Sequence, residues 1–208
     1  PTNKNIYTNY FLCIARFIKV KNYKNLLKGF EIYKNKRGNL NLLIIGSGPE
    51  EKLIKEIKNK SKFSNSIFLE SWKQLNLLPQ YYKEARATVL ASTKETWGLV
   101  INESMASGTP CIVSKNCGCY QDLIEEGNTG WGFDPSNEIE LSNLLLKVEK
   151  INDIEFLKMK NKIRTKINEF SLDNFKQAVD KAIENSLKNR RSSFISAIMA
   201  YILFALKR

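Results

Sequence analysis

Hydrophobic positions follow two alternating patterns along the first two thirds of the chain. Short, almost continuous apolar runs alternate with longer stretches in which apolar residues recur every three or four positions. The short runs predict buried strands, and the longer stretches predict amphipathic helices. The expected strands are 10–15, 40–45, 66–69, 87–91, 110–114 and 130–133. The expected helices are 23–36, 50–60, 77–85, 99–107, 138–150, 154–168 and 172–187.

This alternation predicts an α/β fold, with a Rossmann-like parallel sheet that carries helices on both faces and further helices at the C-terminus. Ligands of such sheets bind beyond the carboxyl ends of the strands. The loops that follow predicted strands are therefore the candidate binding segments. They are 16–22, 46–49, 69–72, 92–98 and 114–120.

Composition narrows the possible chemistry. The 208 residues are 43% hydrophobic and include no histidine, which excludes Ser-His-Asp and Cys-His catalysis within the chain. The net charge is +12, and residues 1–60 hold 13 basic against 4 acidic residues. This excess favours an anionic partner, such as a nucleotide or a membrane surface, although the lysines could also simply solvate helix faces. No basic patch with interleaved aromatic residues supports a nucleic-acid partner.

Two of the candidate loops have residues suited to a phosphorylated sugar. Gly46, Ser47 and Gly48 lie between a strand and a helix, where glycines allow close backbone approach to an anion; a tight turn alone would also explain them. In the later loop, Glu95 follows a strand and Glu103 lies eight residues further on. Carboxylates accept hydrogen bonds from sugar hydroxyls, and the helix start between the two glutamates offers free N–H groups to phosphate.

The segment from Glu95 to Pro110, E-T-W-G-L-V-I-N-E-S-M-A-S-G-T-P, resembles the E-x7-E segment of the family 4 (group 1) retaining glycosyltransferases. The segment from Arg16 to Asn22 and the turn 46–50 resemble two further elements of that family, and 127–135 resembles a third. The similarity covers about residues 10–150 and implies the second, donor-binding domain of the GT-B fold.

The resemblance also implies roles for single residues. Arg16 and Lys21 would bind the donor diphosphate, where cations offset the charge of the leaving group. Glu95 would lie close to the transferred sugar, and Glu103 would hold the ribose hydroxyls. The glycine turn and the backbone of four successive residues would contact the sugar and the phosphate. The four residues are Trp97, Gly98, Leu99 and Val100. The loop 69–72 would lie near the base.

Four positions depart from the family pattern. Ala15 and Ser71 stand where the family usually has glycine, and Trp97 replaces its usual phenylalanine. Cys117 takes the place of the first glycine of a pair that ends in Gly118, so the geometry of that loop is open. No Asp-x-Asp motif is present, and the resemblance implies a reaction without a metal or other cofactor. The cysteines in predicted strands, Cys13 and Cys111, are expected in the core.

Both ends of the chain suggest further organisation. Residues 1–9 are polar and are interpreted as the remnant of an interdomain linker, residues 10–187 as the nucleotide-sugar-binding domain, and 188–208 as an apolar helix with basic flanks. The apolar run 194–206 would span about 20 Å as a helix, which is short for a bilayer core of about 30 Å. It is expected to lie on a membrane surface, to dock on an N-terminal domain, or to pack as a core helix.

Taken together, these features favour the donor-binding half of a retaining hexosyltransferase. It would use a nucleotide diphosphate sugar, with a glycan or lipid-linked acceptor bound by an N-terminal domain. Without that domain the chain alone is expected to be inactive. The expected location is the cytoplasm, at the inner face of the membrane. The alternative is a nucleotide-sugar-binding module without turnover.

Overall fold

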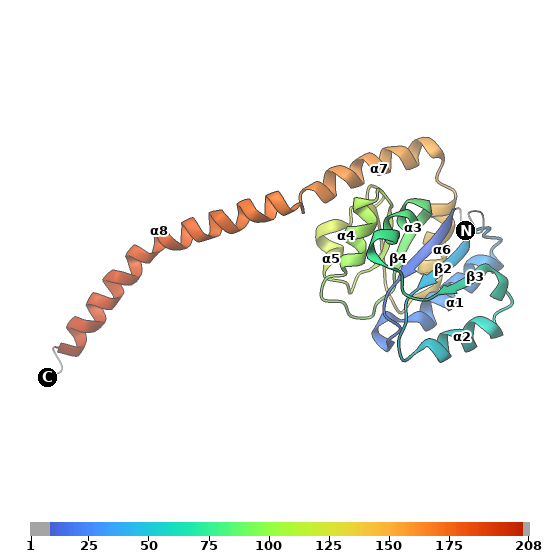
Figure 1. The fold of residues 1–208 in the computed structure, drawn as a ribbon, viewed down its shortest axis with the longest axis horizontal. Helices are drawn as coiled ribbons and strands as arrows, with labels where there is room; N and C mark the ends of the chain where they lie inside the picture. The colour runs from blue at the N-terminus through green and yellow to red at the C-terminus, as the bar shows by residue number, and fades with distance from the viewer. Residues whose placement is uncertain (1–8, 206–208) are drawn as a thin grey trace. The chain divides into compact units, whose positions relative to one another are not determined.

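The computed structural model describes the backbone of residues 9–205 and the side chains of residues 9–188. Six strands form one sheet; they are β1 (Tyr10–Ile14), β2 (Asn41–Ile45), β3 (Ile67–Glu70), β4 (Ala85–Leu90), β5 (Cys111–Ser114) and β6 (Gly130–Phe133). The helices are α1 (Tyr23–Asn35), α2 (Glu51–Lys60), α3 (Leu78–Glu84), α4 (Leu99–Ala106), α5 (Cys119–Leu123), α6 (Glu138–Glu149), α7 (Asp153–Asn168) and α8 (Leu172–Ala205). Figure 1 shows their arrangement.

All neighbouring strands are parallel, in the order β3-β2-β1-β4-β5-β6. This is the order of a doubly wound, Rossmann-like sheet, in which the connections reverse direction between β1 and β4. The predicted fold class is therefore confirmed. The observed strands match the predicted ones to within two residues at each end.

The central strand β1 explains why helices cover both faces. Its side chains alternate between two core clusters, because successive residues of a strand point to opposite faces. Phe11 and Cys13 pack in the cluster that includes α1 and α6, whereas Leu12 packs in the cluster that includes α3. All five residues of β1 are buried, as expected for a parallel sheet covered on both sides.

Two helical features differ from the sequence prediction. Helix α5 begins at Cys119, near the end of the expected loop 114–120, and continues to Leu123. The sequence did not predict it, because five residues are too few to show a helical period. Helix α8 continues without a break from Leu172 to Ala205, where the sequence suggested one helix to residue 187 and a separate apolar tail. The intervening residues 188–193 contain neither Gly nor Pro, so nothing in them stops a helix.

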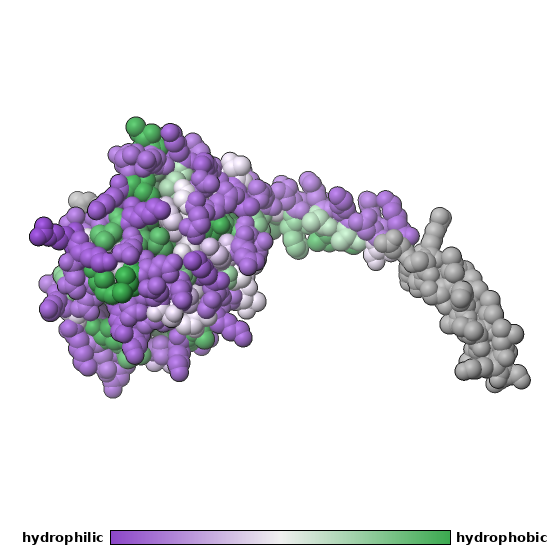
Figure 2. Space-filling view, turned by 180° about the vertical axis from the view of Figure 1, so that it is seen from behind, coloured by the Kyte–Doolittle hydropathy of each residue, from purple (hydrophilic) through white to green (hydrophobic). Residues whose placement is uncertain are grey.

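The chain divides into two compact units, residues 1–167 and residues 168–208. The boundary lies before the expected one at residue 187, so α8 belongs to the second unit. The described part of α8 carries exposed apolar side chains at helical spacing, and Figure 2 shows them gathered along one side. They are Leu172, Phe175, Val179, Ile183 and Leu187.

The terminal segments are described only in part. The predicted linker lies outside the described residues apart from Asn9, as do the side chains of the apolar run 194–206. Within the described part of the chain, no helix has both the length and the apolar character needed to cross a membrane.

Candidate functional site

The candidate site lies where β1 and β4 run side by side. The two strands are hydrogen-bonded neighbours, yet the connections that lead away from them turn to opposite faces of the sheet. In doubly wound sheets, ligands bind at the carboxyl edge beside such a switch point, where the loops diverge. The loop after β1 contains Arg16 and Lys21, and the loop after β4 contains Glu95.

The loop after β1 is held to the rest of this edge by Asn22. This residue adopts the left-handed conformation, with φ of 59°, which Asn tolerates better than most residues. Its side-chain amide donates to the backbone oxygens of Ala91, 3.1 Å away, and Pro135, 2.8 Å away. Asn22 thus fixes the adjacent Lys21 against the ends of β4 and β6. Arg16, at the start of the loop, is exposed.

The glycine turn after β2 packs against this same loop. A Cβ atom on Gly46 would lie 2.1 Å from the backbone oxygen of Ala15, and one on Gly48 would lie 2.6 Å from that of Phe17. The backbone N–H of Phe17 also donates to Ser47, with N and O 2.8 Å apart. The two glycines are thus required by the close approach of two loops, whereas Ser47 is exposed.

Glu95 is fixed by the segment that follows β5. The backbone N–H of Gly118 donates to the oxygen of Glu95 at 3.0 Å, and that of Cys119 donates to the oxygen of Trp97 at 3.1 Å. A Cβ on Gly118 would lie only 2.0 Å from the Thr96 oxygen. The second glycine of the family pair is thus needed for packing, and the buried Cys117 is accommodated in the place of the first.

The side chain of Glu95 meets groups from two loops. Its Oε2 atom forms an ion pair with the Lys21 ammonium and accepts a hydrogen bond from the Ser92 hydroxyl, 3.4 Å away. The Lys21 and Glu95 side chains are 17% and 19% exposed, so the pair is largely shielded from water but still partly accessible. A cation and a carboxylate are therefore in direct contact here.

The N-terminus of α4 lies directly after this loop. Gly98 caps the helix in a left-handed conformation, with φ of 104° and no side-chain hydrogen bond to the first turn. The first N–H groups of the helix, at Leu99 and Val100, therefore remain available to an anion. The Trp97 indole N–H donates to Asn102 Oδ1 at 2.8 Å, which holds the aromatic ring against the first turn of the helix.

Glu103 lies on the second turn of α4 and has a different partner. The hydroxyl of Tyr82, on α3, donates to Glu103 Oε2 at 2.7 Å. Tyr82 is 1% exposed, and burial, followed by this hydrogen bond to a carboxylate, raises its pKa far above the usual range. The two glutamates of the segment therefore belong to separate hydrogen-bond networks.

The structure brings Lys21 and Glu95 into contact, packs Gly46 and Gly48 against the loop that contains Arg16, and sets Glu103 apart. Sequence reasoning did not find Tyr82 or Ser92, because neither belongs to a recognisable motif. It did not identify the contacts of Asn22 either, although Lys21 and Asn22 stood out as a pair. Trp72, in the loop after β3, is 54% exposed, so its ring is accessible.

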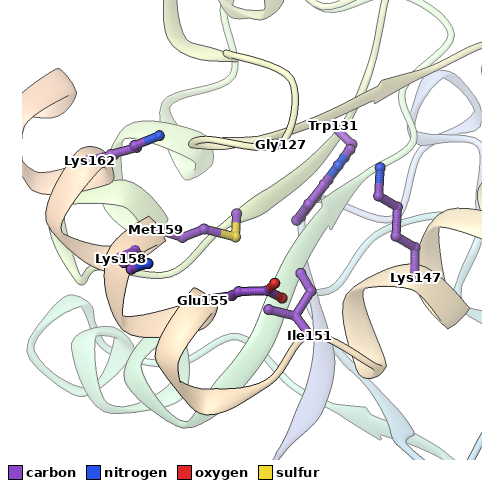
Figure 3. A pocket seen from close by; sticks show the side chains of 8 residues that line it. All are labelled: Gly127, Trp131, Lys147, Ile151, Glu155, Lys158, Met159 and Lys162. Carbon is purple, nitrogen blue, oxygen red and sulfur yellow. The ribbon is translucent and has the colours of Figure 1, made fainter.

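A pocket of about 320 Å³ lies elsewhere, between β6, α6 and α7 (Figure 3). Its walls include Trp131, Met159 and Lys162. Gly127 also lines the pocket and precedes β6, so the pocket lies at the amino end of that strand. None of the residues that line it is one of the predicted donor-binding residues. The pocket is therefore distinct from the candidate site at the carboxyl edge.

Comparison with known proteins gives the family. Residues 2–170 match the sequence model of glycosyl transferases group 1. The chain belongs to this family. The chain is 28% identical over 131 residues to the alpha-monoglucosyldiacylglycerol synthase of Acholeplasma laidlawii. This match covers 62% of this chain and 32% of that protein. It is 32% identical over 119 residues to the N-acetyl-alpha-D-glucosaminyl L-malate synthase of Bacillus anthracis. This match covers 57% of this chain and 30% of that protein.

Solved glycosyltransferase structures share the fold of this chain. A crystal structure of TarM superposes with a TM-score of 0.72 at 22% identity, over 85% of this chain and 36% of that one. The crystal structure of the pneumococcal O-GlcNAc transferase GtfA in complex with UDP and GlcNAc superposes with a TM-score of 0.71 at 21% identity. This superposition covers 87% of this chain and 38% of that one. The expected GT-B type of fold is thereby confirmed. The matches span between 20% and 49% of the length of these curated relatives.

The four cysteines of the chain are buried thiols. Desolvation by burial raises the pKa of each to about 12, so they are neutral at physiological pH. Cys13 and Cys111 lie in strands of the core, as expected. Among the described residues, no group of three or more His, Cys, Asp or Glu side chains is arranged to hold a metal ion.

Proposed function

We propose that this chain is the donor-binding part of a family 4 retaining glycosyltransferase. It binds a nucleotide diphosphate sugar, from which a hexose-type sugar passes to a glycan or lipid-linked acceptor. The observation that carries the proposal is the contact between Lys21 and Glu95, because it joins a phosphate-binding type of group to a hydroxyl-binding type of group. That pair lies at the switch point of a sheet in a chain of the group 1 family.

Each residue contributes a distinct interaction in this proposal. Arg16 and Lys21 bind the diphosphate and offset its charge as the bond to the sugar breaks. The N–H groups of Leu99 and Val100 add hydrogen bonds to phosphate or sugar, as does the backbone from Trp97 to Gly98. Glu95 binds the transferred sugar. Glu103 accepts hydrogen bonds from the ribose hydroxyls.

Other groups contribute more indirectly. The turn of Gly46, Ser47 and Gly48 holds the Arg16 loop at the correct distance and lines the donor site with backbone. The exposed ring of Trp72 is available to the base. The reaction uses no metal, since Arg16 and Lys21 neutralise the leaving group. The acceptor is bound by the part of the protein that corresponds to the rest of the relatives' length.

A peripheral membrane location on the cytoplasmic side accompanies this proposal. The apolar side of α8 is exposed, with Leu172 and Phe175 at 86% and 68%, and residues 188–208 hold five basic and no acidic residues. Apolar burial and attraction to anionic lipids act together in such segments. The name of the Acholeplasma laidlawii relative indicates a membrane lipid as its product, which supports a lipid-linked acceptor here.

Calorimetry tests the donor site. The chain is titrated with UDP, GDP and a single-stranded oligonucleotide, and one of the two nucleotides is expected to bind saturably and more tightly than the oligonucleotide. Binding of the oligonucleotide alone would contradict the proposal. The full-length protein is then tested for transfer, and the anomeric configuration of its product is read by NMR. Binding without transfer favours the alternative, a nucleotide-sugar-binding module, and an inverted product contradicts retention.

A further inference from the structure

Tyr82 is a buried residue whose only polar side-chain atom is hydrogen-bonded to Glu103. The residue lies on α3 in the core cluster below β1 and β2, and it is 1% exposed. Its hydroxyl donates to Glu103 Oε2 at 2.7 Å, while Glu103 itself is exposed. A rigid group inside the protein is thus bonded to a carboxylate at the surface.

The backbone of Tyr82 is fixed independently of this bond. Its carbonyl oxygen accepts a hydrogen bond from the Thr109 hydroxyl at 2.6 Å, and the carbonyl of the preceding Tyr81 accepts one from the Tyr10 hydroxyl at 2.8 Å. The phenol is therefore held in place at both the backbone and the ring. A hydrogen bond from such a group restricts the rotamers of its partner, which an exposed glutamate would otherwise explore freely.

The bond leaves the carboxylate suited to a pair of hydroxyls. With Oε2 oriented by Tyr82, the Oε1 atom and the second lone pair of Oε2 remain to accept hydrogen bonds. The 2′- and 3′-hydroxyls of a ribose are a vicinal pair, and a carboxylate held in one orientation can accept from both. A 2′-deoxyribose offers one of them only, so a fixed carboxylate discriminates between the two sugars.

We propose that Tyr82 is a positioning residue, which orients Glu103 toward the ribose and thereby makes the site selective for ribonucleotides over 2′-deoxyribonucleotides. This inference rests on the proposed function, in which Glu103 holds the ribose. Tyr82 touches no substrate in this account, because it is buried beneath Glu103. Its effect on nucleotide binding passes entirely through that carboxylate.

The Tyr82→Phe variant removes the hydroxyl and keeps the ring. Calorimetry on the full chain measures the affinities for UDP, 2′-deoxy-UDP, GDP and 2′-deoxy-GDP. Loss of the hydrogen bond is expected to weaken binding of the preferred ribonucleotide about 3- to 10-fold. The affinity for the 2′-deoxy form should fall less. The ratio of ribonucleotide affinity to 2′-deoxyribonucleotide affinity should therefore decrease toward the ratio measured for the Glu103→Ala variant.

Tyr33→Phe is the matched control. Tyr33 is also fully buried, and its hydroxyl donates to Glu149 Oε2 at 2.7 Å, but it lies in the other core cluster. This variant is expected to lose thermal stability without any change in the affinity ratio. A ratio that changes in Tyr33→Phe as much as in Tyr82→Phe would show a general loss of structure and overturn the inference.

A double variant separates the two proposals. If Tyr82 acts through Glu103, then Tyr82→Phe has no further effect on nucleotide affinity in a Glu103→Ala background. An effect of equal size in both backgrounds, or an unchanged ratio in Tyr82→Phe while Glu103→Ala lowers it, overturns the inference and leaves the proposed function intact. If Glu103→Ala itself binds the ribonucleotides normally, the ribose role of Glu103 fails, and the inference fails with it.

Discussion

The ammonium of Lys21 contacts Glu95 Oε2 across the boundary between the loops after β1 and β4. The two residues are 74 positions apart in the chain. The side chain of the adjacent Asn22 fixes Lys21, and backbone hydrogen bonds to the segment after β5 fix Glu95. The contact means that the cation and the carboxylate neutralise each other in this structure. A diphosphate that approaches Lys21 would therefore compete with Glu95 for the same ammonium group.

This competition leads to a prediction for Glu95. The Glu95→Gln variant removes a negative charge beside the diphosphate position and frees Lys21, so binding of the free nucleoside diphosphate should be undiminished or slightly tighter. Transfer by the full-length protein should be lost, because Glu95 is expected to bind the transferred sugar. Calorimetry and a transfer assay measure the two effects. Weaker binding of the free nucleotide together with normal transfer would contradict the assignment.

Arg16 is expected to contribute directly to diphosphate binding. Removal of a charged hydrogen-bond donor costs about 1.5–3 kcal/mol, or roughly 10- to 150-fold in affinity. Arg16→Ala should therefore weaken binding of UDP or GDP, measured by calorimetry. Lys24→Ala is the control, because Lys24 is an exposed residue of α1 and its substitution removes the same charge. Equal affinities of the two variants would remove Arg16 from the site.

Arg86 is expected to be important for stability alone. Its guanidinium is buried beside β4 and donates to the backbone oxygens of Val148 and Glu149, at the end of α6, and of Ile151, just after it. It also lies 4.3 Å from the Phe156 ring. Arg86→Met leaves these oxygens without their donor, so the free energy of unfolding should fall by about 3 kcal/mol. Urea denaturation measures this free energy, with Lys83→Ala, at an exposed position, as the control. If Arg86→Met were as stable as the unsubstituted chain, water would have to replace the hydrogen bonds of the arginine.

The buried cysteines predict how stability depends on pH. Burial raises their pKa to about 12 from an ordinary value of 9.0, so the unfolded chain releases thiol protons at a lower pH than the folded chain. Their contribution to stability is complete below pH 9 and is lost as the pH rises toward 12. Urea midpoints should therefore fall above pH 9. Replacement of Cys13 and Cys111 by Ala should reduce this dependence, and an unchanged pH profile would contradict it.

The C-terminal helix predicts membrane capture. Anionic vesicles should bind the full chain through the apolar run 194–206 and the basic residues that flank it, and added salt should weaken this binding by screening the charges. A chain that ends at Leu187 should lose capture in a sedimentation assay. Neutral vesicles are the control. Capture that survives the truncation would exclude the tail, and the basic residues of 1–60 would then be the next candidates.

Local features of the sequence were enough to predict the sheet and the loops at its carboxyl edge. Apolar runs identify strands such as β1, and the carboxyl ends of strands then identify the loops. The bond between Tyr82 and Glu103 could not be predicted, because two helices bring together side chains 21 positions apart. The partners of Arg86 are more than 60 positions away, and a basic residue in a strand gives no sign of them.

The glycines were predicted as ligand contacts, and the structure adds a packing reason that no motif contains. Gly46 packs against the backbone oxygen of Ala15, Gly48 against the backbone of Phe17, and Gly118 against the backbone of Thr96, so the loops at the carboxyl edge are interlocked. An added residue in one of them would displace its neighbours, whereas the exposed turn around Lys62 at the opposite edge has no such constraint. Natural insertions, and any engineered tag or domain, should therefore be tolerated at the amino edge of this sheet.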